Sequence, residues 1–186
     1  MTRSPALGEL TLVTGNENKY REAERLSGRS LSWIAMDLPE IQSLDLYEIL
    51  QQKAREAHRR IGRPVIVEET AFELSAMNGF PGPLVKWLLA AVGCEGIARI
   101  GSALGDTGAR ARCALLALWD DAEIVSEGVT EGLVVDPPRG DRGFGWDPVF
   151  RPEGSAQTYA EMGPTTKDRI GHRGRAWRSF LDRLES

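Results

Sequence analysis

The stretch Leu10-Thr11-Leu12-Val13-Thr14-Gly15-Asn16-Glu17-Asn18-Lys19 opens the chain with a short apolar run, a glycine-containing loop and a polar segment. The apolar residues 10–13 predict a strand that ends at the loop. Residues 19–26 are good helix formers, and Asn16 or Asn18 is the candidate N-cap. The order strand, loop, helix favours phosphate binding, because N–H groups at a helix start face a bound anion. The segment matches neither the Walker loop nor the G-x-G-x-x-G motif.

The rest of the chain alternates strand and helix patterns around a central hairpin. We expect strands over residues 31–36 and 64–67, the second running into Glu68-Glu69-Thr70, with residues 72–77 pairing nearby. A hairpin over 109–119 and 123–135 turns at Asp120-Asp121. Helices are expected over 46–61, 84–92, 96–100 and 164–184. This order mixes βαβ units with a hairpin and predicts an α/β fold with a mixed sheet.

The composition points to a soluble globular protein that forms a single domain over residues 1–186. Hydrophobic residues make up 41% and charged residues 27% of the chain, and the net charge of −4 argues against a general DNA-coating protein. Cys94 and Cys113 have no metal-ligand spacing and predict reduced thiols in the cytoplasm. Residues 1–5 lack the apolar segment of a secretory signal, and no apolar run approaches the length of a membrane span.

Two acidic positions are candidate metal ligands. Glu68 and Glu69 follow a buried strand, and strand ends in α/β sheets open onto the ligand crevice. Adjacent strand residues face opposite sides, so one glutamate is expected to face the ligand and the other to serve the structure. Glu40 follows a Pro-containing turn. Mg²⁺ takes one or two carboxylates together with substrate phosphates. The alternatives are a solvated acidic turn for Glu68-Glu69 and a surface loop for Glu40, because spacing alone does not bring these residues together.

Cationic and aromatic residues supply candidate ligand contacts. Lys86 lies between Val85 and Trp87 in an apolar helix, which predicts a partly buried side chain, whereas a lone lysine is usually on the surface. His172 lies in a basic turn and is a better candidate for ligand contact than His58. The alternative for His172 is a position on the surface of a helix. Phe144 and Trp146 are either a shaped loop or core aromatics. The candidate phosphate or base contacts are Lys19, Lys53, Lys86 and Lys167.

The C-terminal third combines an aromatic pair, flexible glycines, a carboxylate and a group of cationic donors. The aromatic faces suit stacking on a planar ring, and the donors suit its oxygen-bearing edge. With the N-terminal phosphate signal, this inventory favours a nucleotide enzyme. The segments are Gly143-Phe144-Gly145-Trp146-Asp147-Pro148, Gln157-Thr158-Tyr159-Ala160-Glu161-Met162 and Lys167…His172-Arg173.

These motifs together resemble the inosine triphosphate pyrophosphatase (Ham1-like) family, and the resemblance runs nearly end to end. Several motifs in one order are more specific than any one of them. Besides the C-terminal segments above, the resemblance rests on Val13 to Lys19, Asp37-Leu38-Pro39-Glu40, Val67-Glu68-Glu69-Thr70 and Gly79-Phe80-Pro81-Gly82-Pro83…Lys86-Trp87.

The resemblance implies an elongated two-lobed α/β fold with a cleft, a homodimer, and Mg²⁺-dependent hydrolysis of ITP, dITP or XTP to the monophosphate and pyrophosphate. It implies no stable nucleic-acid partner and no membrane. Glu40 and Glu69 would hold the metal, Glu69 would also be the base for the attacking water, and Lys19 would assist catalysis. The substrate contacts would be Thr14, Gly15, Asn16, Glu17, Asn18, Lys19, Lys53, Glu69, Thr70, Lys86, Phe144, Gly145, Trp146, Asp147, Lys167, His172 and Arg173.

Two positions depart from the family pattern. Glu69 stands where the family usually has aspartate, and Gly171 where it usually has serine. These departures motivate a second hypothesis, a nucleotide-binding protein that has lost hydrolysis. A third is a broader pyrophosphatase that acts on modified pyrimidine or sugar nucleotides.

Overall fold

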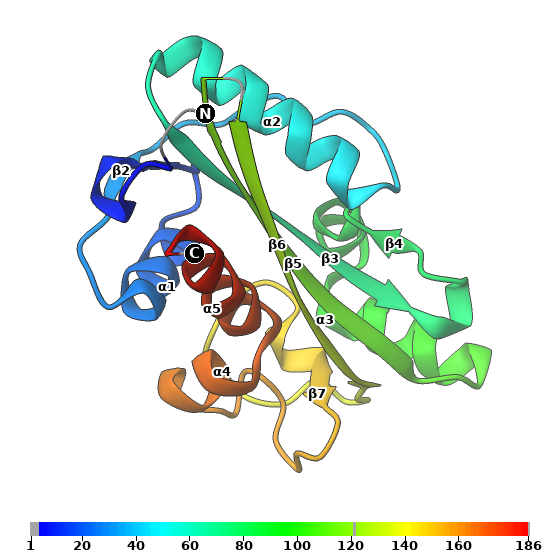
Figure 1. The fold of residues 1–186 in the computed structure, drawn as a ribbon. Helices are drawn as coiled ribbons and strands as arrows, with labels where there is room; N and C mark the ends of the chain where they lie inside the picture. Colours follow the sequence, from blue (N-terminus) through cyan, green and yellow to red (C-terminus); the bar gives the residue numbers. More distant parts are fainter. Residues whose placement is uncertain (1–3, 121, 186) are drawn as a thin grey trace.

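A mixed sheet of seven strands lies at the centre of the computed structural model, which describes residues 4–120 and 122–185 (Figure 1). The main strand order is β2-β1-β3-β5-β6-β7, and β4 pairs with β3. The strands β1 to β3 pair in parallel, and the other pairs are antiparallel. The predicted mixed α/β fold is therefore confirmed. The bounds are β1 Thr11–Val13, β2 Ser32–Ile34, β3 Val65–Leu74, β4 Pro81–Gly82, β5 Gly108–Trp119, β6 Ala122–Val134 and β7 Phe150–Pro152.

Helices cover both faces of the long strands. Helix α2 packs on one face, against Val65 and Val67 of β3 and Leu116 of β5. Helices α1 and α5 pack on the other, around Ile66 and Leu115 (Figure 1). The bounds are α1 Glu17–Ser27, α2 Leu46–Ile61, α3 Val85–Leu104, α4 Pro164–Ile170 and α5 His172–Leu184, with 3-10 turns η1 Leu7–Glu9, η2 Ser75–Met77 and η3 Asp147–Val149.

The two helices that carry site residues have strong local start and stop signals. The Asn16 side chain accepts hydrogen bonds from the backbone N–H groups of residues 18 and 19, and α1 ends at Gly28 in the left-handed conformation. Asp45 caps α2 in the same way, and α2 ends at left-handed Gly62. A capping side chain satisfies N–H groups that the helix leaves unpaired, and glycine adopts positive φ without a steric cost. These signals fix where each helix begins relative to the preceding loop.

The strand carrying the two glutamates is longer than expected. Residues 65–74 form one strand rather than a strand ending before Glu68, because β5 pairs with it along its whole length, from Val65 to Leu74. The parallel partner β1 pairs only as far as Ile66. The glutamates therefore lie in mid-strand, yet beyond the point where the parallel part of the sheet stops.

The C-terminal helix is divided and the α3 region is continuous. The expected helix 164–184 breaks at Gly171, whose extended backbone (φ −76°, ψ 159°) separates α4 from α5. The expected helices 84–92 and 96–100 both belong to α3, which is kinked at Gly93. Strand β7 was not expected from the sequence. Residues 1–3 of the expected signal-free N-terminus and Asp121 of the expected hairpin turn lie outside the described residues.

Helix α3 differs from the expectation that no apolar run approaches a membrane span. By length and composition it meets that criterion, with a mean hydropathy of 1.3 over a window that is 17% buried. One such helix is weak evidence for a membrane. Ile97 and Ala98 in its second half are fully buried in the protein core.

We predict that Gly128→Ala destabilises the protein by about 1–3 kcal/mol, because small-to-large changes in a packed interior force backbone shifts. A Cβ atom at Gly128 would lie 2.1 Å from the His172 carbonyl oxygen and 2.3 Å from the Ala176 backbone nitrogen, where β6 packs on α5. Gly8→Ala is the matched control, since no atom lies within 4 Å of its Cβ position. Urea denaturation of both variants measures the difference, and equal midpoints would contradict the close packing.

Candidate active site

A cavity of about 540 Å³ opens beside the carboxyl ends of the parallel strands. The loop after β1, the segment after β2 and the middle of β3 form one side, and the start of α3 with residues 144–146 forms the other. Elements distant in sequence thus meet at one hollow. Its lining is Val13, Thr14, Gly15, Asn16, Lys19, Met36, Asp37, Leu38, Glu40, Lys53, Glu69, Thr70, Pro83, Val85, Lys86, Trp87, Leu89, Phe144, Gly145 and Trp146.

The loop after β1 lies against the Asp37 side chain of the segment after β2. A Cβ atom at Gly15 would lie 2.0 Å from the Asp37 Oδ1 atom. The Asn16 backbone N–H donates to the Thr14 hydroxyl at 3.1 Å, which fixes the turn. Lys19 follows on α1 and lies 3.5 Å from Glu68 (Nζ to Oε1). Of this predicted phosphate segment, Glu17 and Asn18 are exposed and do not line the cavity; Glu17 pairs with Arg21.

Glu40 and Glu69 converge on one ammonium group. Lys53 Nζ on α2 donates to Glu69 Oε2 at 2.7 Å, to Glu40 Oε1 at 3.0 Å and to the Glu68 carbonyl at 3.3 Å. A lysine ammonium has three donors, so this one is fully satisfied. The two carboxylates are 29 positions apart in the sequence (69 minus 40), so the fold supplies the convergence that spacing left open.

Electrostatic attraction favours the charged forms of Glu40 and Lys53. Burial disfavours the charge on Glu40, but Lys53 outweighs it and lowers the pKa of that carboxyl. Burial likewise opposes the charge on Lys53, while Glu69 and Glu40 outweigh it and raise the pKa of the ammonium. The Glu40 and Glu69 side chains therefore share the Lys53 ammonium group at the cavity.

The second oxygen of Glu69 is also positioned. Oε1 accepts from the Thr70 backbone N–H at 3.1 Å. The Glu69 side chain thus turns back on its own strand, with one oxygen on Thr70 and the other on Lys53. The side chain of Glu69 is 9% exposed and that of Glu40 is 42% exposed, so the two carboxylates differ in access.

The carboxylates suit a hard divalent cation. Within residues 4–120 and 122–185, no group of three His, Cys, Asp or Glu side chains forms a complete metal site. Mg²⁺ does not require one, because it is usually held by one or two carboxylates, with substrate phosphates and water completing its shell. Glu40 and Glu69 provide two, beside the loop that begins α1. The donor set therefore fits Mg²⁺ arriving with a phosphate substrate.

The lysine and aromatic residues that α3 and residues 144–146 contribute to the cavity differ in their exposure to solvent. Lys86 is exposed rather than partly buried, and its Nζ lies 5.7 Å from the centroid of exposed Trp87. Trp146 is 8% exposed and stacks on Phe72, with ring centroids 4.4 Å apart. Trp146 is therefore a core aromatic with one edge on the cavity, whereas Phe144 is half-buried.

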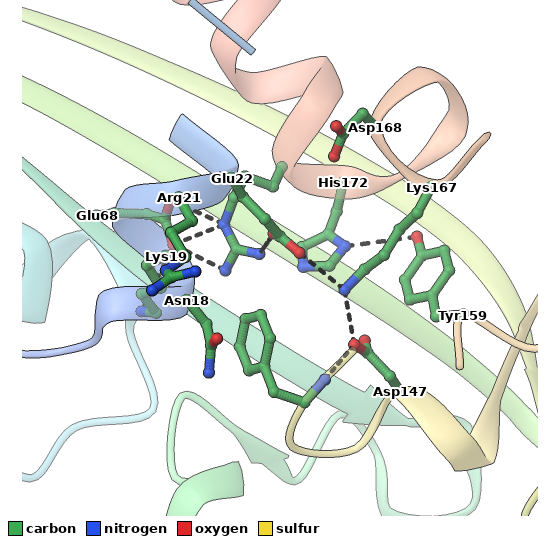
Figure 2. Close-up of polar contacts among 12 residues, drawn as sticks. Asn18, Lys19, Arg21, Glu22, Glu68, Asp147, Tyr159, Lys167, Asp168 and His172 are labelled. Carbon is green, nitrogen blue, oxygen red and sulfur yellow. Dashed lines mark hydrogen bonds and ion pairs between the residues drawn. The ribbon is translucent and has the colours of Figure 1, made fainter. Parts of the chain in front are cut away.

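A buried charge cluster consists of Glu22, Glu68, Asp147, Lys167 and Arg173. Figure 2 labels the first four of these residues. Lys167 Nζ lies 2.6 Å from Asp147 Oδ2 and 3.1 Å from Glu22 Oε1. The Arg173 guanidinium donates to both oxygens of Glu68 and also to Glu22. A buried charge left without a partner costs several kcal/mol, so these pairings hold α1, β3, α4 and α5 in one arrangement.

Burial and neighbouring cations act in opposite directions on the pKa values of Glu22 and Asp147. Burial opposes ionisation of Glu22, but Arg173 and Lys167 lower the pKa of its carboxyl. Burial raises the pKa of Asp147, an effect that Lys167 partly offsets. Asp147 also accepts from the Phe144 backbone N–H at 2.8 Å, which ties the cluster to the cavity wall. Glu22 was not predicted from the sequence; its one signal is its position three residues after Lys19 on the same helix.

The three residues predicted to read the base edge do not line the cavity. Lys167, His172 and Arg173 are all buried, and the half-buried Phe144 ring contacts two of them. Its centroid lies 4.9 Å from Lys167 Nζ and 5.5 Å from Arg173 Cζ. Phe144 therefore contacts both the cavity and the cluster, and base contact by these residues stays a prediction.

Comparison with known proteins adds independent evidence. A sequence profile described as the Ham1 family matches residues 10–183. The chain is 42% identical over 172 residues to inosine triphosphate pyrophosphatase 2 of Trypanosoma cruzi strain CL Brener, covering 90% of this chain and 88% of that protein. It is 38% identical over 187 residues to inosine triphosphate pyrophosphatase of Puccinia graminis f. sp. tritici, covering 95% and 94%.

A solved structure has the same fold. The Ham1 protein from Coxiella burnetii superimposes with a TM-score of 0.81 at 26% identity, covering 95% of this chain and 98% of that one. The agreement in sequence extends over nearly all of the elements that build the cavity. This chain belongs to the Ham1 family.

Proposed function

We propose that this protein hydrolyses non-standard purine nucleoside triphosphates, namely ITP, dITP and XTP, to the monophosphate and pyrophosphate with the help of Mg²⁺. The coarser assignment, a nucleotide pyrophosphatase that cleaves an acid anhydride, follows from relatives named inosine triphosphate pyrophosphatase over most of the chain. The observation that carries the finer proposal is the convergence of Glu40 and Glu69 at a cavity bordered by the Thr14–Lys19 segment.

The chain supplies the polar end of such a site. Lys19 and Lys86 line the cavity with the helix start at Asn16, so positive charge and N–H donors suit a triphosphate. Lys53 supplies a third cation to the same region. Glu40 and Glu69 would hold Mg²⁺, which when bound would neutralise phosphate charge and orient the pyrophosphate leaving group.

Glu69 is the base in this proposal because its carboxylate faces the cavity and is fixed at both oxygens. It accepts a proton from a water molecule whose oxygen attacks the α-phosphorus. The bond between the α-phosphorus and the bridging oxygen then breaks, and pyrophosphate leaves with the electron pair. The homodimer, the cytoplasmic location and the absence of nucleic-acid and membrane partners stay predictions from the sequence.

Discrimination against adenine follows from hydrogen-bond pairing at the purine 6-position, whereas exclusion of guanine, which also has a 6-keto group, depends on the 2-position. A keto oxygen at the purine 6-position accepts from Lys167, His172 or Arg173, whereas the amino group of adenine leaves such donors unpaired. Each buried group left unpaired costs about 1–3 kcal/mol. Ring entry requires movement of Phe144, which lies between Gly143 (φ 72°) and Gly145 (φ 65°).

A nucleotide panel tests the proposal. With Mg²⁺, we expect ITP, dITP and XTP to give the monophosphate and pyrophosphate much faster than ATP or GTP does. Pyrophosphate and orthophosphate are measured separately in each reaction. Release of orthophosphate would contradict the cleavage position. Tight ITP binding by calorimetry without any product would favour the alternative of a nucleotide-binding protein without hydrolysis.

We expect Glu69→Gln to lower kcat by about 10²- to 10⁴-fold, the range typical for loss of a general base, while the fold is retained. The matched control is Glu73→Gln on the same strand, because Glu73 pairs with Arg110 and Arg112 and does not line the cavity. Steady-state kinetics and thermal unfolding of both variants provide the comparison. Near-normal turnover of Glu69→Gln would remove this residue from its assigned role.

Lys53→Met is expected to tighten Mg²⁺ binding to the nucleotide-free protein about tenfold, which corresponds to a change of about 1.4 kcal/mol in binding free energy. The reason is that the Lys53 ammonium already occupies the carboxylate oxygens that the cation needs. Calorimetric titration with MgCl₂ measures this change. Arg55→Met on the exposed side of α2 is the control for loss of one positive charge. Unchanged or weaker binding would show that Lys53 and the cation do not compete.

A further inference from the structure

His172 is a neutral imidazole in a closed aromatic environment. It is 2% exposed and is the first residue of α5. Its ring centroid lies 5.4 Å from that of Trp146 and 5.7 Å from that of Tyr159. Burial, followed by the positive charges of Arg173, Lys167 and Lys19, holds the pKa of His172 well below its usual value. A neutral imidazole has one N–H donor and one bare acceptor, so its tautomer decides what its free edge recognises.

The Tyr159 hydroxyl lies next to this ring. Its oxygen is 3.4 Å from His172 Nδ1, the contact drawn in Figure 2. Tyr159 is fully buried, and burial raises its pKa to about 12, so the phenol keeps its hydrogen. The nearby Thr130 hydroxyl donates its own hydrogen to the Ile170 carbonyl at 3.2 Å. Thr130 therefore has no hydrogen left to give to Tyr159.

The Tyr159 hydroxyl lies beside the start of α5. This helix has no capping side chain of its own, because residue 171 is glycine. A Cβ atom at Gly171 would lie 3.4 Å from the Tyr159 hydroxyl and 2.6 Å from the Lys167 carbonyl oxygen. The glycine thus leaves room for the Tyr159 hydroxyl at the helix start, and the hydrogen-bond distance that this hydroxyl makes is the one to His172 Nδ1.

We propose that Tyr159 is a positioning residue that donates its hydroxyl hydrogen to Nδ1 of His172 and so holds the imidazole proton on Nε2. This inference rests on the proposed function, in which His172 meets the edge of the purine ring. An Nε2–H group donates to a 6-keto oxygen and finds no acceptor on a 6-amino group. Tyr159 therefore contributes to the preference for keto purines through the tautomer of His172, without contact with the substrate.

The opposite arrangement is chemically distinct. If the proton were on Nδ1, it would be donated to Tyr159, and the Tyr159 hydrogen would turn toward Thr130. Nε2 would then be a bare acceptor and would favour an amino group over a keto oxygen. The two arrangements differ only in hydrogen positions, so a measurement that locates the imidazole proton decides between them.

Nitrogen NMR of the nucleotide-free protein makes this measurement. The chain has two histidines, so His58→Gln leaves His172 as the one imidazole in the spectrum. We expect the pattern of a neutral ring with protonated Nε2 and bare Nδ1 in ¹⁵N-labelled protein. A protonated Nδ1 would overturn the proposal. The wild-type tautomer decides this point even if variants at Tyr159 fail to fold.

Kinetics of Tyr159→Phe test the consequence. We expect the ratio of kcat/KM for ITP to that for ATP to fall about tenfold, and the His172 nitrogen signals to shift toward a mixture of tautomers. Tyr47→Phe is the matched control. The Tyr47 hydroxyl donates to Glu127 at 2.7 Å, and Tyr47 does not line the cavity. An unchanged ratio in Tyr159→Phe would overturn the role in selectivity. Wild-type protein without an ITP preference would instead contradict the proposed function, and the NMR result would still locate the proton.

Discussion

Two adjacent buried carboxylates on the central strand, Glu68 and Glu69, impose the main electrostatic constraint on this protein. They are 4% and 7% exposed, and strand alternation directs them to opposite faces of the sheet. Each face must supply its own cation, because an unpaired buried carboxylate is costly. Helix α5 supplies Arg173 to Glu68, and helix α2 supplies Lys53 to Glu69. The positions of both helices are thus coupled to one dipeptide.

The two faces differ in their access to solvent. On the Glu68 face, the cluster with Glu22 and Lys167 is buried and its charges are paired with one another. On the Glu69 face, the parallel strand β1 stops pairing at Ile66, and the space beyond it is the cavity. A buried cluster suits the orientation of a rigid ring, and an open carboxylate pair suits an exchangeable cation and phosphates. The same strand therefore supports both ends of a nucleotide site, with Phe144 at the boundary.

Local patterns in the sequence predicted most of the helices and strands, but they did not predict the contacts between these elements. The strand at 10–13, the cap at Asn16 and the hairpin β5–β6 follow from short-range signals, and the structure has all three. The sequence did not predict the break at Gly171, because the apolar residues of α4 and α5 together follow a single helical periodicity. The approach of Glu40 to Glu69 was supplied by the family resemblance, since no spacing rule joins residues on separate elements. The roles of Glu22 and Tyr159 could not be assigned from the local pattern, because their partners lie more than ten positions away in the chain.

At Glu69 and Gly171, the two positions that the resemblance marks as departures from the family, a neighbouring group makes a polar contact, which argues against a loss of hydrolysis. At Glu69, the added methylene is taken up by a bond from the Thr70 N–H, and the other oxygen still reaches the ammonium that also holds Glu40. At Gly171, the missing side chain leaves a helix start that the Tyr159 hydroxyl approaches instead. A chain drifting away from its chemistry would be expected to lose partners at these positions. Here the carboxylate keeps a donor on each oxygen and the buried imidazole keeps a hydroxyl on Nδ1, so both substitutions preserve the polar pairing on which catalysis and base reading would depend.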